Sequence, residues 1–490
     1  MDSNFYNWQG TGEEKETKLL TLSEFRRELG IPLVLAKKMI VWGIVGAYTT
    51  VDGTIRITEG ELLKTRELLK DPRKKIKLFA RSLGPGFITG ASDDDPSGIA
   101  TYSAVGAKFG FSLLWMCLWT TPMMLAIQET CARIGVVANK GLAGVLQKHY
   151  SRKIVISVVA LLIIANTVNI GADIGAMAAS LRLLVDINFF LAAIIFTALI
   201  VVIEVFVPYC AYVKVLKWLT VFIFAYIATG IIVRPDWLVV VRETFTPELR
   251  FDDDYIFAVV AFLGTTITPY LFFWQTSEEV EENILANGNK VLTPYKRTQR
   301  IARMRTDVKA GMILSNLVAF FIVLTTASVL FKHGVTNIES AEQAAEALRP
   351  LAGEYAYLLF ALGIIGTGLL AVPILAGAGA YALSEVMNWR EGLGQKFSKA
   401  RGFYIIIILS IIAGMALNFI GINPIVALYY TAFLNGVIAV PLLIVIMIVG
   451  NDPKIMGQET HPKWVKFFGW LAVVSMALAV FLSLGLNFVV

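Results

Sequence analysis

The stretch Gly90-Ala-Ser-Asp-Asp-Asp-Pro-Ser-Gly98 places three consecutive carboxylates and a proline inside an apolar run that covers residues 79–108. Phe79–Ala91 alone is too short to cross about 30 Å of hydrocarbon as a helix, so we expect the polar stretch to interrupt a membrane span. A charge buried there costs several kcal/mol unless it is compensated. No Lys or Arg lies within ten positions of the three carboxylates on either side. A bound cation would supply the missing charge; a solvated acidic loop outside the membrane is the alternative.

A second interruption, Leu263-Gly-Thr-Thr-Ile-Thr-Pro-Tyr270, lies inside the apolar run 256–282. It supplies hydroxyl groups and freed backbone carbonyls, and four glutamates at 278–282 follow it, which we interpret as the cytoplasmic end of that run. The two interruptions open two blocks of five apolar runs each. This placement predicts inverted repeats with discontinuous first helices, whose unwound backbone offers oxygen ligands to cations near the middle of the membrane. Two unrelated proline kinks are the simpler alternative.

Hydropathy indicates a polytopic membrane protein. The mean hydropathy is +0.67 and only 16% of the 490 residues are charged, against about 25% in a soluble domain. Eleven apolar runs are long enough to span a bilayer, and we expect an all-α fold with eleven transmembrane helices. The runs are 79–108, 112–134, 154–182, 189–207, 215–233, 256–282, 310–331, 355–387, 403–420, 425–449 and 465–489.

The net charge of +6 follows the expected membrane topology. Lys and Arg gather in alternate loops, at 73–81, 133–153, 214–217, 296–305, 390–401 and 454–466. The positive-inside rule then puts the N-terminus in the cytoplasm and the C-terminus outside a plasma or inner cell membrane. A basic surface for nucleic acid explains the same charges less economically, so the expected partners are cations and the lipid bilayer. The sequence does not indicate an oligomeric state.

Residues 1–76 are more polar and predict a small cytosolic domain, with the membrane part at 77–490. Leu22–Leu29 has a helical pattern, 51–57 alternates like a strand, and Glu59–Leu69 indicates a closing helix. The layout resembles the winged helix-turn-helix of excisionase-like DNA-binding modules. However, the expected recognition helix, 34–45, is apolar. A packing or regulatory domain is therefore one interpretation, and a membrane-tethered metal sensor that regulates transcription is the alternative.

Neither an enzyme nor a zinc protein is indicated. The three cysteines, Cys117, Cys131 and Cys210, lie in or beside apolar runs without CxxC spacing. The three histidines lie outside the runs, so no span offers a histidine ligand or proton relay. The chain has no Walker A loop and no HExxH motif. We expect no resident cofactor, and a metal ion would be the transported substrate.

The two interrupted runs carry a resemblance to a known family. The stretch GPGFITGASDDDPSGIATYSAVGAKFGFSLLW (84–115) resembles the first span of the NRAMP family, natural resistance-associated macrophage proteins, whose signature there is Asp-Pro-Gly-Asn. The stretch GTTITPYLFFWQ (264–275) resembles the sixth span, with its Met-Pro-His signature. The similarity extends over about 78–490. It implies a LeuT-like fold and import of divalent transition metals, usually driven by protons.

The resemblance assigns the candidate site residues. The metal-binding aspartate of the family falls on Asp95, its asparagine on Gly98, its carbonyl donor on Thr265 and its methionine on Thr268. Ser92 and Asp94 are further candidate ligands beside the first break. The family's histidine falls on Tyr270, and its acidic proton-path pair falls on Asn169 and Ala172, with an acid displaced to Asp173. We group Asp173, Asn169, Tyr270 and Asp93 as candidates for a proton path or vestibule.

These departures change the expected substrate. Replacing a thioether by Thr268 removes the soft ligand that favours transition metals over hard ions. Gly98 lacks the asparagine side chain, which predicts a larger site that could hold a partly hydrated ion, and Mg²⁺ dehydrates reluctantly. We therefore expect import of Mg²⁺ or Mn²⁺ by alternating access, close to the magnesium-transporting relatives of the family. The missing acids and histidine predict weak proton coupling or none.

Overall fold

The computed structural model describes residues 19–31, 33, 36, 39–40, 45–49, 55–70, 84–207, 220–288 and 293–487. The chain forms two compact units. The smaller unit comprises Met1–Leu83 with Thr298–Arg303, and the larger comprises Gly84–Arg297 with Met304–Val490.

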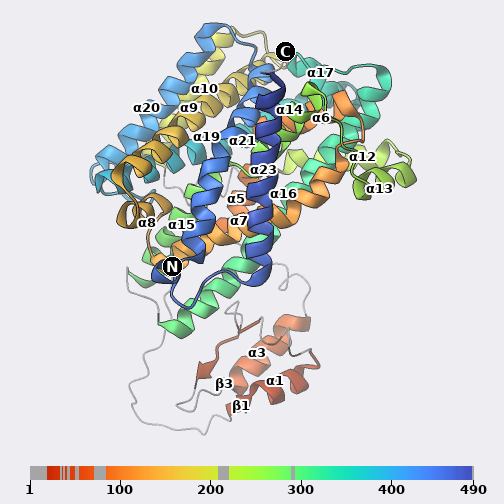
Figure 1. Cartoon of the computed structure of the whole chain (residues 1–490). Helices are drawn as coiled ribbons and strands as arrows, with labels where there is room; N and C mark the ends of the chain where they lie inside the picture. The colour runs from red at the N-terminus through yellow and green to blue at the C-terminus, as the bar shows by residue number, and fades with distance from the viewer. Residues whose placement is uncertain are drawn as a thin grey trace. The chain divides into compact units, whose positions relative to one another are not determined.

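The larger unit is a helical bundle (Figure 1). Its helices are α5 (Pro85–Asp93), α6 (Pro96–Phe109), α7 (Leu114–Ala138), α8 (Leu142–His149), α9 (Arg152–Arg182), α10 (Phe189–Phe206), α12 (Phe224–Ile232), α13 (Trp237–Phe245), α14 (Asp253–Thr266), α15 (Pro269–Asn287), α16 (Pro294–Val329), α17 (Ala341–Glu346), α18 (Arg349–Ala352), α19 (Ala356–Met387), α20 (Arg401–Leu417), α21 (Pro424–Asn451), α22 (Pro453–Met456) and α23 (Lys463–Asn487). Short 3₁₀ turns lie at Thr220–Ile223, Phe331–His333, Gly353–Tyr355 and Asn418–Ile420.

Eight helices of the described residues are long and apolar enough to cross a membrane. They correspond to the expected runs three, four and six to eleven. The other three expected runs are not among the eight, so the count of eleven is not confirmed. The first run is divided into α5 and α6, α7 contains the polar residues Gln128, Glu129 and Arg133, and the fifth run begins outside the described residues. The α12 segment bends by 117° into α13.

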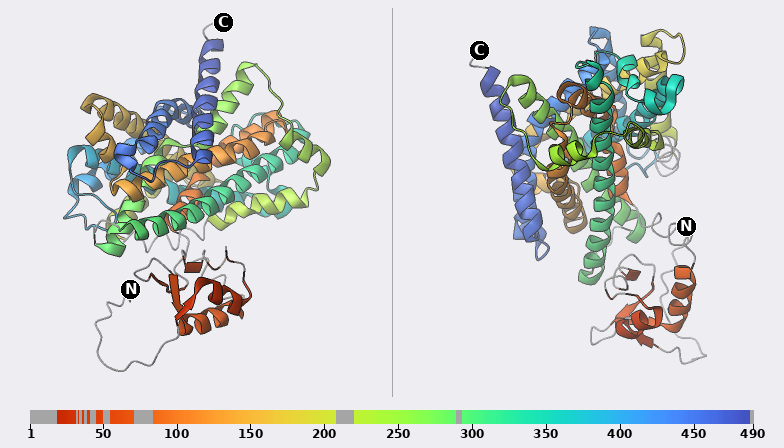
Figure 2. Two further views of the ribbon diagram at one scale, coloured as in Figure 1. Left: turned by 60° about the horizontal axis from the view of Figure 1, so that its bottom comes forward. Right: turned by 90° about the vertical axis from the view of Figure 1, so that its right-hand side faces the viewer.

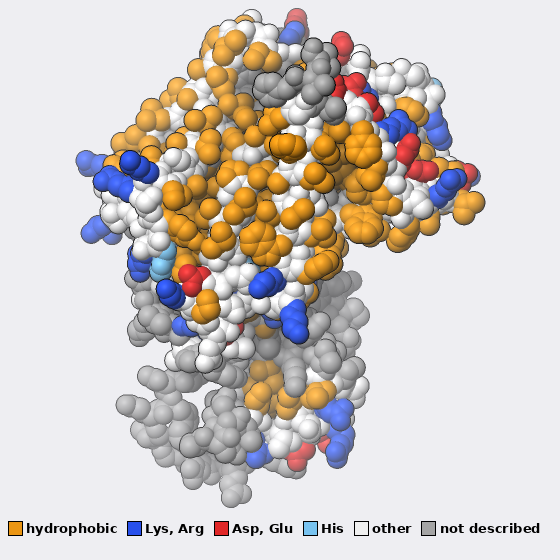
Figure 3. All heavy atoms as spheres, in the orientation of Figure 1, with side chains coloured by type: hydrophobic (Ala, Val, Ile, Leu, Met, Phe, Trp, Pro, Cys, Tyr) orange, Lys and Arg blue, Asp and Glu red, His pale blue; other side chains and the backbone are white. Residues whose placement is uncertain are grey.

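The outer surface of the helical unit is apolar. Large hydrophobic side chains are exposed along α9, α10, α20 and α23, among them Ile164, Leu191, Leu409 and Phe481. Figure 3 shows such side chains covering the middle of one face, with Lys, Arg, Asp and Glu towards its edges. Soluble monomers rarely expose apolar patches of more than a few hundred Å². This surface fits contact with lipid, while polar groups gather inside the bundle.

Both expected interruptions are present. α5 ends at Asp93 and α6 begins at Pro96; α14 ends at Thr266 and α15 begins at Pro269. Proline suits the first position of a helix because its ring presets φ and its missing N–H would have no partner there. Each break is therefore made by a proline that starts the second half-helix, and the prediction of discontinuous helices is confirmed.

The two broken helices run in opposite directions beside each other. α5 packs against α15, and α6 packs against α14. The first half of one broken span thus lies against the second half of the other, as inverted repeats require. α9 packs against α6, α19, α20 and α21 (Figures 1 and 2), so its inner face lies close to the first break.

The smaller unit contains a three-stranded antiparallel sheet in the order β1-β3-β2. Its elements are β1 (Leu19–Thr21), α1 (Leu22–Leu29), β2 (Tyr48–Thr49), β3 (Ile55–Thr58) and α3 (Glu59–Lys70). Phe25, Ile57 and Leu62 belong to its buried core, and Thr21 with Glu24 forms a capping box at the start of α1. The two predicted helices are confirmed. The expected recognition helix and the expected boundary at 76 lie largely outside the described residues.

Candidate cation-binding site

Asp95 lies at the first break, where it caps the N-terminus of α6. Its Oδ1 accepts hydrogen bonds from Ser97 Oγ (2.7 Å) and from the Gly98 backbone N–H (2.7 Å), and its Oδ2 accepts one from Asn169 Nδ2 on α9 (3.2 Å). The side chain is buried. All three donors are neutral, so hydrogen bonds orient this carboxylate but leave its charge without a counter-charge from them.

The second break supplies oxygen atoms near Asp95. A Cβ atom at position 98 would stand 3.4 Å from Thr265 Oγ1 and 3.6 Å from Asp95 Oδ1, so Gly98, Thr265 and Asp95 meet in one place. Thr268 Oγ1 donates to the Thr265 carbonyl (2.5 Å). A carbonyl oxygen has two lone pairs, so Thr265 keeps one for a further partner.

The surroundings of Gly98 are closely packed. A Cβ atom there would also lie 3.1 Å from the Asp93 carbonyl oxygen, a contact tighter than most real Cβ contacts. The larger site expected from the loss of an asparagine side chain at this position stays a prediction. The absence of a soft ligand at Thr268 is then the stronger indication of preference for hard ions.

The other acids of the first break contact a different helix. Ser315 Oγ on α16 lies 2.8 Å from Asp93 Oδ2 and 3.3 Å from Asp94 Oδ1. Ser92 Oγ donates to the Thr89 carbonyl within α5 (2.9 Å). The structure therefore brings Asp95, Gly98, Thr265 and Thr268 together. The Asp93 and Asp94 carboxylates face Ser315, whose single hydroxyl proton can go to only one of them, and Asp93 Oδ1 has no hydrogen-bond partner among the described residues. Sequence reasoning missed Ser315 because nothing in an apolar run marks one serine as facing a site.

The candidates for a proton path surround the same place. Asn169 contacts Asp95 directly, and Asp173 follows one turn later on α9. Tyr270 Oη donates to the Ser92 carbonyl (2.8 Å), which ties the start of α15 to the end of α5. Asp173 is fully buried, and neither of its carboxylate oxygens has a hydrogen-bond partner among the described residues.

The donor set has the chemistry of a hard-cation site. In the described part of the chain, no group of three or more His, Cys, Asp or Glu side chains has the geometry of a metal site. The oxygen atoms near Asp95 belong to carboxylate, hydroxyl, side-chain amide and backbone carbonyl groups. Such donors suit Mg²⁺, Ca²⁺ or Mn²⁺, and Mg²⁺ in particular keeps several waters and needs few protein ligands.

Asp307 on α16 caps the N-terminus of α5, the first half of the first broken helix. Its carboxylate accepts backbone N–H groups of Gly84 (2.8 Å), Gly86 (2.7 Å) and Phe87 (3.1 Å) at the start of α5. Gly84 has no side chain to cap this helix. A carboxylate at a helix N-terminus satisfies orphan donors and complements the helix dipole. This cap comes from more than 200 positions away in sequence, so local patterns could not predict it.

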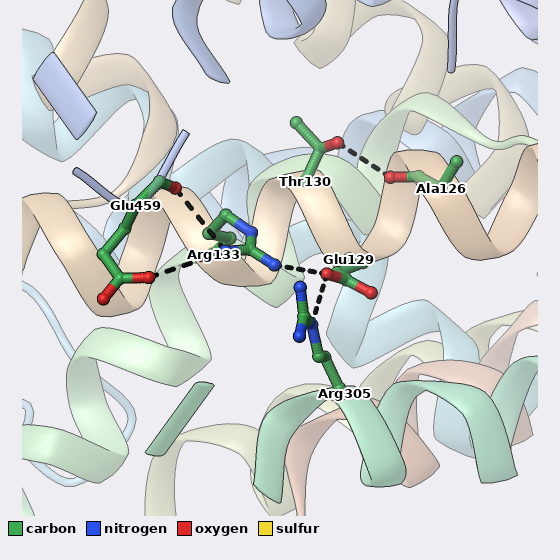
Figure 4. A network of polar contacts seen from close by, with 6 residues as sticks. All are labelled: Ala126, Glu129, Thr130, Arg133, Arg305 and Glu459. Carbon is green, nitrogen blue, oxygen red and sulfur yellow. Dashed lines mark hydrogen bonds and ion pairs between the residues drawn. The ribbon is translucent and has the colours of Figure 1, made fainter. Parts of the chain in front are cut away.

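A buried ion network lies along α7 (Figure 4). Glu129 Oε1 accepts from the Arg133 guanidinium and from Arg305 Nε of α16 (2.7 Å). Arg133 Nη1 also lies 3.9 Å from a Glu459 carboxylate oxygen, in the segment between α22 and α23. Nearby, burial and the positive charges of Arg133 and Lys466 lower the pKa of His461 to about 4. The network links three parts of the helical unit.

Solved structures with low sequence identity share the fold. The manganese transporter of Eremococcus coleocola matches with a TM-score of 0.66 at 18% identity, over 84% of this chain and 88% of that chain. Mhp1, a nucleobase-cation-symport-1 family transporter, matches with a TM-score of 0.52 at 15% identity, over 82% of this chain and 91% of that chain. These likenesses show a LeuT-like helical fold.

Sequence comparisons agree with the fold. The divalent metal cation transporter MntH of Klebsiella pneumoniae is 25% identical over 405 residues, which cover 82% of this chain and 92% of that protein. The model of the natural resistance-associated macrophage protein-like (Nramp) family matches residues 86–485 and includes both broken helices. The chain therefore belongs to the Nramp family, as its two interrupted spans predicted.

Proposed function

We propose that this protein transports divalent metal cations across a membrane and that the ion binds between the two helix breaks, with Asp95 as its principal ligand. Members of the family are transporters and not enzymes. One observation carries the assignment to Asp95: it is buried, and its hydrogen-bond donors are all neutral. A divalent ion would compensate that charge, and the Thr265 carbonyl and hydroxyl would complete part of its oxygen shell.

The ion is hard, either Mg²⁺ or Mn²⁺. Relatives are named as divalent metal cation and manganese transporters. In this chain the methionine position is Thr268, whose hydroxyl donates to Thr265 instead of offering a soft sulfur. A thioether sulfur is a soft ligand that binds transition metals more tightly than hard ions. A site without it has no ligand that favours transition metals in this way. Magnesium, the most abundant hard divalent ion in cells, then becomes a substrate.

Transport proceeds by alternating access. The two breaks meet at the site, and each half-helix can move against its neighbours while the ion stays bound, as in other folds with inverted repeats. Turnover by such a route is slow compared with conduction through an open pore. Unitary currents from the purified protein in a planar bilayer would contradict this mechanism.

Uptake is weakly coupled to protons or uncoupled. The histidine position of the family is Tyr270, and its acidic pair is Asn169 and Ala172. Tyrosine in water titrates near pH 10, too high for a group that must exchange protons in each transport cycle. The membrane potential alone favours entry of a divalent ion by about 4.6 kcal/mol per 100 mV.

The charge distribution supports a cell-membrane location with a cytoplasmic N-terminus and an external C-terminus. Residues 1–76 would then form a cytosolic domain with a packing or regulatory role. If residues 1–76 changed the electrophoretic mobility of DNA in a salt-dependent way, the membrane-tethered regulator would be favoured instead.

A competition assay tests the function. The full-length protein is reconstituted in sealed vesicles that contain a fluorescent indicator of divalent ions, and the entry of Mg²⁺, Mn²⁺ and Ca²⁺ is compared without a pH gradient. We expect saturable entry of Mg²⁺ and of Mn²⁺. Mg²⁺ should inhibit the entry of Mn²⁺, and Mn²⁺ should inhibit the entry of Mg²⁺. Protein-free vesicles are the control, and equal signals with and without protein would contradict the proposal.

A further inference from the structure

The inner face of α9 carries two polar side chains that belong together. Asn169 and Asp173 are four residues apart in a continuous helix, so they lie on the same face, one turn from each other. Both are fully buried. Asn169 Nδ2 donates to Asp95 Oδ2, which places this face against the first break.

Three oxygen atoms on this face have no hydrogen-bond partner among the described residues: Asn169 Oδ1 and both carboxylate oxygens of Asp173. Buried polar atoms are normally paired, and a buried carboxylate without a partner costs several kcal/mol. Asp173 lies one helical turn from Asn169, which contacts Asp95, so two buried carboxylates stand near each other. The arrangement is unfavourable unless a positive charge binds between them or a proton neutralises one.

Packing holds this face in place. On the opposite side of α9, a Cβ atom at Gly171 would stand 2.5 Å from the Gly414 carbonyl oxygen, so the backbones of α9 and α20 are in direct contact. Asn418 Nδ2 also donates to the Gly171 carbonyl (2.9 Å). Since the helix cannot rotate without breaking this contact, Asn169 and Asp173 stay directed away from α20.

We propose that α9 completes the cation site: Asp173 is a second anionic ligand and Asn169 Oδ1 a neutral one, opposite the ligands from the broken helices. The inference rests on the proposed function and extends it to a third helix. Two carboxylates balance the charge of one divalent ion, whereas Asp95 alone leaves half of it uncompensated. The ligand class is oxygen only, which fits a hard ion that keeps part of its water shell.

The competing explanation is that Asp173 carries a proton and serves as a relay displaced along α9. The two explanations differ in what Asp173→Asn changes. A lost ligand weakens ion binding in the absence of any transport, whereas a lost relay leaves binding intact and removes proton movement that accompanies transport.

Equilibrium binding of Mn²⁺ to the purified full-length protein, followed by electron paramagnetic resonance of the free ion, separates them. We expect Asp173→Asn to raise the Kd at least about tenfold, which corresponds to about 1.4 kcal/mol. Asp186→Asn, at an exposed acid beyond the end of α9, is the matched control and should bind like the wild type. Asn169→Asp adds a carboxylate to the same face and should lower the Kd.

The outcomes are distinct. Wild-type affinity in Asp173→Asn overturns the inference, and loss of metal-driven acidification in the same variant would then identify a relay. If Asp173→Asn does not yield a monodisperse protein, Asn169→Asp decides: tighter Mn²⁺ binding supports the site on α9, and unchanged or weaker binding overturns it. Absence of saturable Mn²⁺ binding to the wild type would overturn the proposed function itself.

Discussion

Asp95 has two roles that a single substitution can separate. It caps α6 by accepting the Gly98 backbone N–H, and we propose that it binds the ion. Asparagine is as good an N-cap as aspartate, whereas alanine costs about 0.5–2 kcal/mol. Substitution by Asn therefore removes the charge while keeping the cap.

We predict that Asp95→Asn folds like the wild type but loses saturable Mn²⁺ binding and uptake. Its melting temperature and its elution on size exclusion report whether it folds. Asp95→Ala should lower the melting temperature, because the cap is lost, and should also lose uptake. Near-normal uptake by Asp95→Asn at equal protein levels would remove Asp95 from the site and direct attention to Asp93 and Asp94.

A second prediction concerns Thr268. Thr268→Met places a thioether at the position of the family's metal-binding methionine. Cd²⁺ and Mn²⁺ should then compete against Mg²⁺ at lower concentrations than in the wild type, with the larger gain for the softer Cd²⁺. Thr268→Leu, of similar size but without sulfur, is the control. If methionine and leucine have the same effect on competition, size explains the change and bonding character does not.

At the scale of the element, the sequence was most informative where proline and charge interrupt an apolar run. Pro96 and Pro269 begin α6 and α15, so the breaks were predictable to within a residue or two. Asp95 was predictable because a carboxylate precedes one break. Ser315 and Asp307 were not, because both act from α16 across more than 200 residues of sequence. The close contacts around Gly98 depend on how the two breaks pack together, which a single sequence does not encode locally.

Asp307 gives a prediction about α5. Its carboxylate accepts three backbone N–H groups, and a hydrogen bond to a charged group contributes about 1.5–3 kcal/mol. In Asp307→Ala the start of α5 should fray, and amide hydrogen exchange over 84–90 should accelerate at least about tenfold. Asp307→Asn keeps one acceptor oxygen and should give an intermediate rate. Wild-type exchange in Asp307→Ala would show that packing alone holds α5.

The network in Figure 4 gives a prediction about stability. Glu129 is the shared partner of Arg133 and Arg305, and removing one member of a buried ion pair costs about 3–5 kcal/mol because a buried charge is left behind. Glu129→Ala should therefore lower the thermal unfolding midpoint of the purified protein markedly. Glu342→Gln, at an exposed position of α17, is the control and should leave it unchanged. Equal midpoints for both variants would refute the structural role.

At the scale of the whole molecule, three features fit transport of an ion through the interior. The two broken helices run in opposite directions, the outer surface is apolar, and the interior carries charged groups. The protein moves an ion along its interior while lipid contacts its surface. At the family's histidine and acidic positions this chain has Tyr270, Asn169 and Ala172, and we propose that the neighbouring acid Asp173 is a ligand. The central claim is thus uncoupled divalent-cation transport through the Asp95 site.

One measurement tests this claim most directly. Full-length protein is reconstituted in vesicles that contain a divalent-ion indicator and a pH dye, and a potassium diffusion potential, negative inside, is imposed. The account predicts that Mg²⁺ and Mn²⁺ enter at a saturable rate that rises with the potential, while internal pH stays constant. Entry that leaves the interior acidified in proportion to the metal, or no divalent entry at any potential, would contradict it.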